Sequence, residues 1–126
     1  MTTTLDLDPV REAALIAAQN DAFRRSILGT TPVADASQGQ FVMTRGVAAL
    51  GINAQLELTR RVAAFDRFNA DSDPQGWHEM GVIEFEDTTV WFKIDLYDVD
   101  YPYGSPEPSD PEQTRRVLTL LLPSEY

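Results

Sequence analysis

Two short runs in which apolar and other residues alternate, separated by only two residues, constrain the fold of this chain most strongly. In residues 79–86, Ile83 and Phe85 fall on one side and Glu84 and Glu86 on the other. In residues 89–97, every second residue is apolar: Val90, Phe92, Ile94 and Leu96. The residues between them are Trp91, Lys93, Asp95 and Tyr97. Such alternation is typical of half-buried strands, and the short Asp87-Thr88 connection predicts that they pair as a hairpin.

The first half of the chain has helical periodicity instead. Asp8-Pro9 is a helix start signal, and a helix is predicted over residues 9–28, with Gly29 as its stop. Its expected buried stripe consists of Leu15, Ile16, Phe23 and Ile27. A second helix is predicted over residues 53–68, capped by Asn53, with Leu58, Val62 and Phe65 facing inward. On its exposed face, Glu57 and Arg61 are spaced to form an ion pair.

The remaining segments are shorter or less regular. Residues 30–39, 69–78 and 98–113 are rich in loop-forming residues, and the last of these segments holds four of the eight prolines. Residues 40–44 are a candidate strand, and residues 45–51 a helical turn between two glycines. Residues 116–122 form a nearly continuous apolar run, which is typical of a central strand covered on both faces.

Helices followed by strands predict an α+β fold, with two N-terminal helices packed on a small antiparallel sheet of about three or four strands. The length of 126 residues is that of one domain, so residues 1–126 are predicted to form a single domain in which residues 1–8 are flexible. The absence of cysteine excludes disulfides, thiol nucleophiles and thiolate metal sites. Without a membrane-spanning apolar run or a basic, apolar leader in residues 1–6, a cytoplasmic location is expected.

Negative charge is concentrated in one part of the chain. Residues 71–112 hold 12 of the 20 acidic side chains and one of the ten basic ones, so this segment carries −11 and the rest of the chain +1. This balance argues against direct binding to nucleic acid or to a membrane. Carboxylates on a sheet face can imitate a row of phosphates and occupy the basic groove of a nucleic-acid-binding protein. The alternative is that the acidic surface serves only solubility.

The residues predicted to contact such a partner lie on the hairpin and the loop after it. They are Glu84, Glu86, Asp87, Asp95, Asp98, Asp100, Tyr101 and Tyr103. Aromatic side chains inside a charged rim give an interface its affinity, and Trp91 and Tyr97 adjoin the same region. The same aromatic residues can instead pack under the 98–113 loop or under a helix, and packing of this kind is expected for Trp91.

The single histidine marks the other candidate site. His78 follows Asp71 and Asp73 and precedes Glu79, and these four side chains can supply ligands to a divalent metal. The segment resembles a calcium loop, but Val82 stands at the twelfth position and Pro74 interrupts it. A turn stabilised by its own aspartates is the expected structure, so no metal site, cofactor or catalytic residue is predicted.

Several segments together resemble a small bacterial family of domains of unknown function that is common on plasmids and other mobile elements. They are residues 20–24 (NDAFR), 44–51 (TRGVAALG), 62–68, 73–79 (DPQGWHE), 92–98 (FKIDLYD), 103–106 (YGSP) and 116–126. Trp77 stands where an acidic residue precedes the histidine in this family. The resemblance implies no reaction, but its setting on mobile DNA favours roles in counter-defence or plasmid maintenance.

The leading hypothesis is therefore a non-enzymatic, acidic protein-binding module that acts as a DNA mimic. It would inhibit a CRISPR or restriction complex of the host, as an anti-CRISPR or antirestriction protein does. The alternative is a small metal- or carboxylate-dependent enzyme that uses the loop from Asp71 to Glu79.

Overall fold

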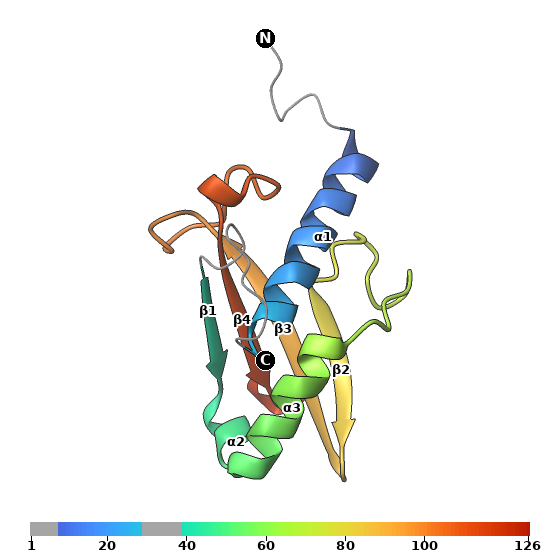
Figure 1. The fold of residues 1–126 in the computed structure, drawn as a ribbon, viewed down its shortest axis with the longest axis vertical. Helices are drawn as coiled ribbons and strands as arrows, with labels where there is room; N and C mark the ends of the chain where they lie inside the picture. The colour runs from blue at the N-terminus through green and yellow to red at the C-terminus, as the bar shows by residue number, and fades with distance from the viewer. Residues whose placement is uncertain (1–7, 29–38) are drawn as a thin grey trace.

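The computed structural model describes residues 8–28 and 39–126, and it combines three α-helices with one four-stranded sheet in this part of the chain (Figure 1). The elements in chain order are α1 (Pro9–Ser26), β1 (Gly39–Met43), α2 (Arg45–Ala48), α3 (Ile52–Ala64), β2 (Met80–Phe85), β3 (Thr88–Tyr97), η2 (Pro111–Gln113), β4 (Arg115–Leu121) and η3 (Pro123–Glu125). The α+β class is confirmed. The predicted stop at Gly29, the loop from residue 30 to 38 and the predicted flexibility of residues 1–7 lie outside the described residues.

The sheet has the strand order β1-β4-β3-β2, so β4 is central, as predicted. The pairs β2–β3 and β3–β4 are antiparallel, but β1 runs parallel to β4. The sheet is therefore mixed and not antiparallel throughout. A parallel pair needs a long crossover between its strands, and here residues 44–114, more than half of the chain, separate β1 from β4.

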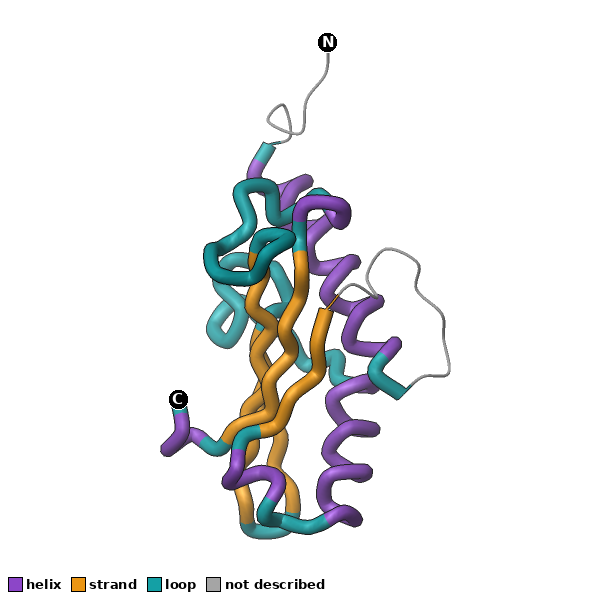
Figure 2. Tube along the Cα trace, turned by 90° about the vertical axis from the view of Figure 1, so that its left-hand side faces the viewer, coloured by secondary structure: helices purple, strands orange, loops and turns teal. Residues whose placement is uncertain are grey.

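Both long helices cover the same face of the sheet, as Figures 1 and 2 show. On this face the alternation predicted for the hairpin is confirmed: Val90, Phe92 and Ile94 are buried, as is Ile83 on the neighbouring strand. Their partners in the core include Leu118 and Leu120 of β4, Phe23 of α1, and Leu58 and Val62 of α3. Among the described residues no α-helix lies over the other face of the sheet, and only the short η3 segment reaches it, where Tyr126 contacts Trp91 (Figure 2). β4 is therefore covered by α-helices on one face only, although the apolar run predicted cover on both.

The helices differ from the predictions in their ends and in one residue of the expected buried stripe. Asp8 was expected to be flexible, but its carboxylate accepts a hydrogen bond from the Arg11 amide and caps α1. Leu15 is 43% exposed and does not join the buried stripe. Gly51, not Asn53, is the N-cap of α3, and the helix ends at Ala64 because Phe65 adopts an extended conformation with ψ 133°.

The connection between β2 and β3 consists of Glu86 and Asp87, one residue earlier than predicted. Glu86 has φ 52°, which is the left-handed region that a glycine favours in such turns. Both acidic side chains are exposed at the tip of the hairpin.

No helix in the described part of the chain is both long and apolar enough to cross a membrane.

Candidate functional site

The face of the sheet opposite α1 and α3 is a surface that the long helices leave open (Figure 2). From β3 it presents Trp91, Lys93, Asp95 and Tyr97, the series opposite the buried one. Beside them lie Val82 and Glu84 on β2 and Val117 and Thr119 on β4, according to the ladder register. The surface is amphipathic, since the aromatic side chains of Trp91 and Tyr97 lie on either side of the charged Lys93 and Asp95 along β3. We call it the open face.

The predicted partner-binding residues divide into two groups at the two ends of β3 (Figure 1). Glu84, Glu86 and Asp87 lie at the hairpin end, and Asp98, Asp100, Tyr101 and Tyr103 lie in the loop at the other end. Because β3 has ten residues, the two groups are about 30 Å apart. Asp95 lies between them, on the strand itself. The structure therefore does not bring the predicted residues into one compact patch.

Asp95 is the member of this set whose charge is balanced locally. Its Oδ2 accepts a hydrogen bond from Lys93 Nζ at 2.7 Å, and both side chains are about one-third exposed. The bond to Asp95 raises the pKa of the Lys93 ammonium. Negative charge that is free to meet a partner therefore belongs mainly to the two ends of the open face.

The loop at the far end is ordered by its own hydrogen bonds. The Asp98 amide donates to the Tyr103 carbonyl at 2.7 Å, and the Asp98 carboxylate accepts from the Asp100 amide. Tyr101 has φ 77°, and its ring lies 6.5 Å from that of Tyr97. Tyr103 is 74% exposed, so of the two predicted tyrosines it is the one that projects into solvent.

The C-terminal segment covers one side of Trp91. The Tyr126 ring meets the indole edge-to-face at 5.7 Å, whereas packing under a loop or a helix was expected for Trp91. Glu125 fixes this segment, because its carboxylate accepts hydrogen bonds from the amides of Gly46 and Leu122 and from the Thr44 hydroxyl. These bonds lower the pKa of the Glu125 carboxyl.

The second candidate site surrounds His78, on the helix-covered side of the molecule. His78 Nδ1 lies 2.9 Å from Asp21 Oδ1 of α1, and its ring stacks on Phe68 with centroids 4.1 Å apart. The Asp73 carboxylate accepts hydrogen bonds from the amides of Trp77 and His78. His78 also has φ 56°, so its backbone is held in a sparsely populated conformation. Asp73 and His78 are thus brought together as predicted, but Asp71 is exposed and bonds only within the turn.

Buried polar groups connect this site to the core. Arg24 is 1% exposed, donates to Asp21 at 2.8 Å and to the Phe65 carbonyl at 2.7 Å, and lies over the Phe68 ring. Arg116 is equally buried and donates to Asn20 Oδ1 at 2.7 Å. Burial lowers the pKa of Arg116 to about 10, which still leaves it charged near neutral pH.

Sequence reasoning missed the partners that α1 supplies to this network. Asp21 precedes His78 by 57 residues, and no local pattern relates the two positions.

Comparison with known protein families gives one match. The family model described as "Protein of unknown function (DUF3768)" matches residues 43–125, about two-thirds of the chain. The chain belongs to the DUF3768 family. No curated protein and no solved structure matches it significantly.

The part of the chain that matches DUF3768 contains β2, β3 and β4, the open face and the loop that carries Asp73 and His78, but only Met43 of β1. It does not include α1, so Asp21 and Arg24 complete the His78 site from outside the matched region. The matched region therefore holds the open face but only part of the His78 site, which α1 completes.

Neither site gathers a set of metal ligands. Among the described residues, no group of three or more His, Asp or Glu side chains is placed to hold a metal ion. We expect calorimetric titration with zinc, calcium, manganese and magnesium to show no stoichiometric site tighter than micromolar. A one-to-one site that is lost in His78→Ala would contradict this expectation and favour an enzymatic function.

Glu79, next to His78, has a pH-dependent effect on stability. Burial, together with the nearby charges of Asp73 and Asp95, raises the pKa of the Glu79 carboxyl above its ordinary 4.5. A carboxyl whose pKa is raised on folding favours the folded state at low pH, and this contribution is lost as pH rises through the raised pKa. Glu79→Gln should therefore increase the urea midpoint at pH 7 and leave it nearly unchanged below pH 4.5. A lower midpoint for Glu79→Gln at pH 7 would contradict this assignment.

Proposed function

We propose that this protein is a non-enzymatic inhibitor that binds a basic nucleic-acid-binding protein through the open face. The observation that carries the proposal is the arrangement of charge on that face, with two acidic ends about 30 Å apart and, between them, the rings of Trp91 and Tyr97 on either side of the Lys93–Asp95 ion pair. One turn of B-DNA spans about 34–36 Å, so two acidic ends at this separation are spaced like phosphates one turn apart.

The apolar and aromatic groups of the open face support the same proposal. Interfaces combine such groups with charged ones, and here Val82 lies beside Trp91, with Tyr97 at the far end of β3. Val82 is 50% exposed, so it is available to a partner without a change in the fold. The acidic ends would guide a basic surface toward these groups and accelerate encounter.

The partner that we propose is a host defence complex of the CRISPR or restriction type, and the inhibitor would act as a DNA mimic in the cytoplasm. This proposal combines the acidic face with the resemblance to domains carried on mobile elements.

Purified CRISPR effector complexes and restriction endonucleases, each loaded with a fluorescent duplex, provide the test. Addition of the protein should release the labelled DNA from at least one of them, with the anisotropy falling to that of free duplex. A ternary complex that retains the DNA would contradict mimicry, and binding to none of these enzymes would contradict the proposed class of partner.

One observation favours a second function, a small enzyme that uses the loop from Asp71 to Glu79. His78 is oriented by Asp21 in a strained backbone conformation, and its side chain is 31% exposed. An oriented and accessible imidazole can serve as a general acid or base. If the protein is such an enzyme, His78→Gln should abolish its activity on the partner, because the imidazole is lost. The charge reversals on the open face should leave that activity intact.

A further inference from the structure

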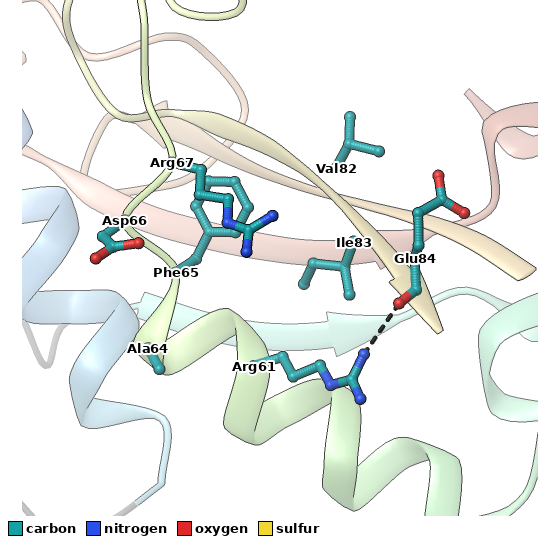
Figure 3. Close-up of a pocket in the computed structure, with 8 residues that line it drawn as sticks. All are labelled: Arg61, Ala64, Phe65, Asp66, Arg67, Val82, Ile83 and Glu84. Carbon is teal, nitrogen blue, oxygen red and sulfur yellow. Dashed lines mark hydrogen bonds between the residues drawn. The ribbon is translucent and has the colours of Figure 1, made fainter. Parts of the chain in front are cut away.

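A cleft of about 520 Å³ lies beside the edge strand β2, away from the centre of the open face (Figure 3). Its walls come from the end of α3, from the extended segment that follows, and from β2 itself. The side chains that matter for its chemistry are Arg61, Phe65, Asp66, Arg67, Val82 and Glu84. The cleft shares Val82 and Glu84 with the open face, but its other walls lie outside the surface that the proposed inhibitory function uses.

The backbone of β2 faces the cleft with groups that the sheet leaves free. In an antiparallel pair, successive residues point their amide and carbonyl groups alternately toward and away from the partner strand. The Glu79 carbonyl accepts from the Ile94 amide on β3, so Met80, Val82 and Glu84 direct theirs outward. Arg61 confirms this direction, because its guanidinium donates to the Glu84 carbonyl at 2.9 Å. The outward amide and carbonyl of Val82 have no hydrogen-bond partner among the described residues.

Arg67 brings to this edge a positive charge that is unpaired among the described residues, although the chain as a whole carries −10, whereas Arg61 is paired with Glu57 at 2.9 Å. In Figure 3 the guanidinium groups of Arg61 and Arg67 are directed toward β2, whereas the Asp66 carboxylate points away from it. The Glu84 carboxylate is held by the Thr89 hydroxyl of β3 at 2.9 Å, so it is engaged on the other side of the strand. Arg67 has no hydrogen-bond or ion-pair partner in the described part of the chain, and it is exposed.

We propose that this cleft binds an extended peptide segment that carries an acidic side chain and adds to β2 as a further strand. The peptide backbone would pair with the free amide and carbonyl of Val82, as in other cases of strand addition to an exposed edge. Its carboxylate would be bound by Arg67, with Arg61 beside it, since planar guanidinium groups suit carboxylates. An apolar side chain one position away would point to the opposite face of the sheet and pack on Val82.

A small anion could bind to the guanidinium groups, but it would leave the free backbone groups of β2 without hydrogen-bond partners. A second copy of this chain is a poor occupant, because β2 and its hairpin carry Glu84, Glu86 and Asp87 on the outside, and like charges would face one another. An acidic peptide in extended conformation satisfies both the free backbone groups of β2 and Arg67.

Fluorescence anisotropy with a labelled hexapeptide of alternating valine and glutamate tests the proposal. The peptide should bind saturably, and Arg67→Glu should weaken it by about tenfold or more, as expected for loss of a charge-assisted contact. Arg25→Glu, an exposed charge reversal on α1, is the matched control and should leave the affinity unchanged. Three further peptides complete the design. One has glutamine in place of glutamate. The other two have alternate backbone amides methylated, one in each of the two registers.

The glutamine peptide should bind weakly, and methylation in one register should abolish binding, because only strand addition requires free peptide amides. Val82→Pro removes the outward amide of β2 without removing a bond of the β2–β3 ladder, and it should likewise abolish binding. If Val82→Pro does not fold, the methylated peptides still decide the question. Equal affinity for the acidic and glutamine peptides, or for the methylated and unmethylated ones, would overturn the proposal. The proposal would also be overturned if two copies of the chain associated with each other and thereby displaced the bound peptide.

Discussion

Replacing Phe92 by alanine should lower the free energy of unfolding by about 3–5 kcal/mol. Phe92 is fully buried, and its ring contacts Phe65 edge-to-face at 5.1 Å, with Arg24 5.9 Å from its centroid. The removed ring cannot be replaced by its neighbours, because Gly81 opposite it has no side chain that could fill the space. Urea denaturation followed by tryptophan fluorescence measures the effect.

Val82→Ala is the matched control for this substitution. Val82 lies on the neighbouring strand, one position from the partner of Phe92 in the ladder, but its side chain is 50% exposed. Its replacement should change the stability by only about 0.5 kcal/mol. Equal effects of Phe92→Ala and Val82→Ala would contradict the register that places Phe92 under the helices.

Reversing four charges along the open face should abolish binding to the proposed partner while leaving the fold intact. The substitutions are Glu84→Lys, Glu86→Lys, Asp95→Lys and Asp98→Lys. They place positive charge at both acidic ends and break the exposed pair of Asp95 with Lys93, which contributes about 0–1 kcal/mol. The melting temperature should change little, because relief of like-charge repulsion offsets that loss. Surface plasmon resonance and thermal unfolding measure the two effects.

The control carries the same number of reversals elsewhere in the chain, at Asp6, Glu12, Asp66 and Asp71. Asp8 is not suitable, because its carboxylate caps α1 and its loss would destabilise the helix. If this control weakens binding as strongly as the reversals on the open face, net charge alone would account for the interaction.

Local patterns predicted those parts of the fold that depend on neighbours in the sequence. The alternation in residues 89–97 placed Val90, Phe92 and Ile94 correctly, since one face of a half-buried strand must be apolar. The spacing of Glu57 and Arg61 predicted an ion pair that the structure shows at 2.9 Å. The central position of β4 followed from its continuous apolar run.

Long-range partners could not be predicted in this way. Residues 40–44 indicated a strand, but no local pattern distinguishes a parallel from an antiparallel neighbour, so the pairing of β1 with β4 was missed. The contact of Trp91 with Tyr126 depends on how η3 turns back at the end of β4. The sequence predicted an exposed position for Arg61 and indicated no role for Arg67, because the cleft exists only once α3 ends beside β2.

The ionic-strength dependence of partner binding, measured with and without competing duplex DNA, tests the central claim most directly. If the open face imitates DNA, the association rate should fall steeply as salt rises, because opposite fields guide the encounter. Duplex DNA should then displace the wild-type protein, since both occupy one groove. An affinity that is indifferent to salt and to DNA would contradict the account, and the acidic segment would be a solvated surface without a partner.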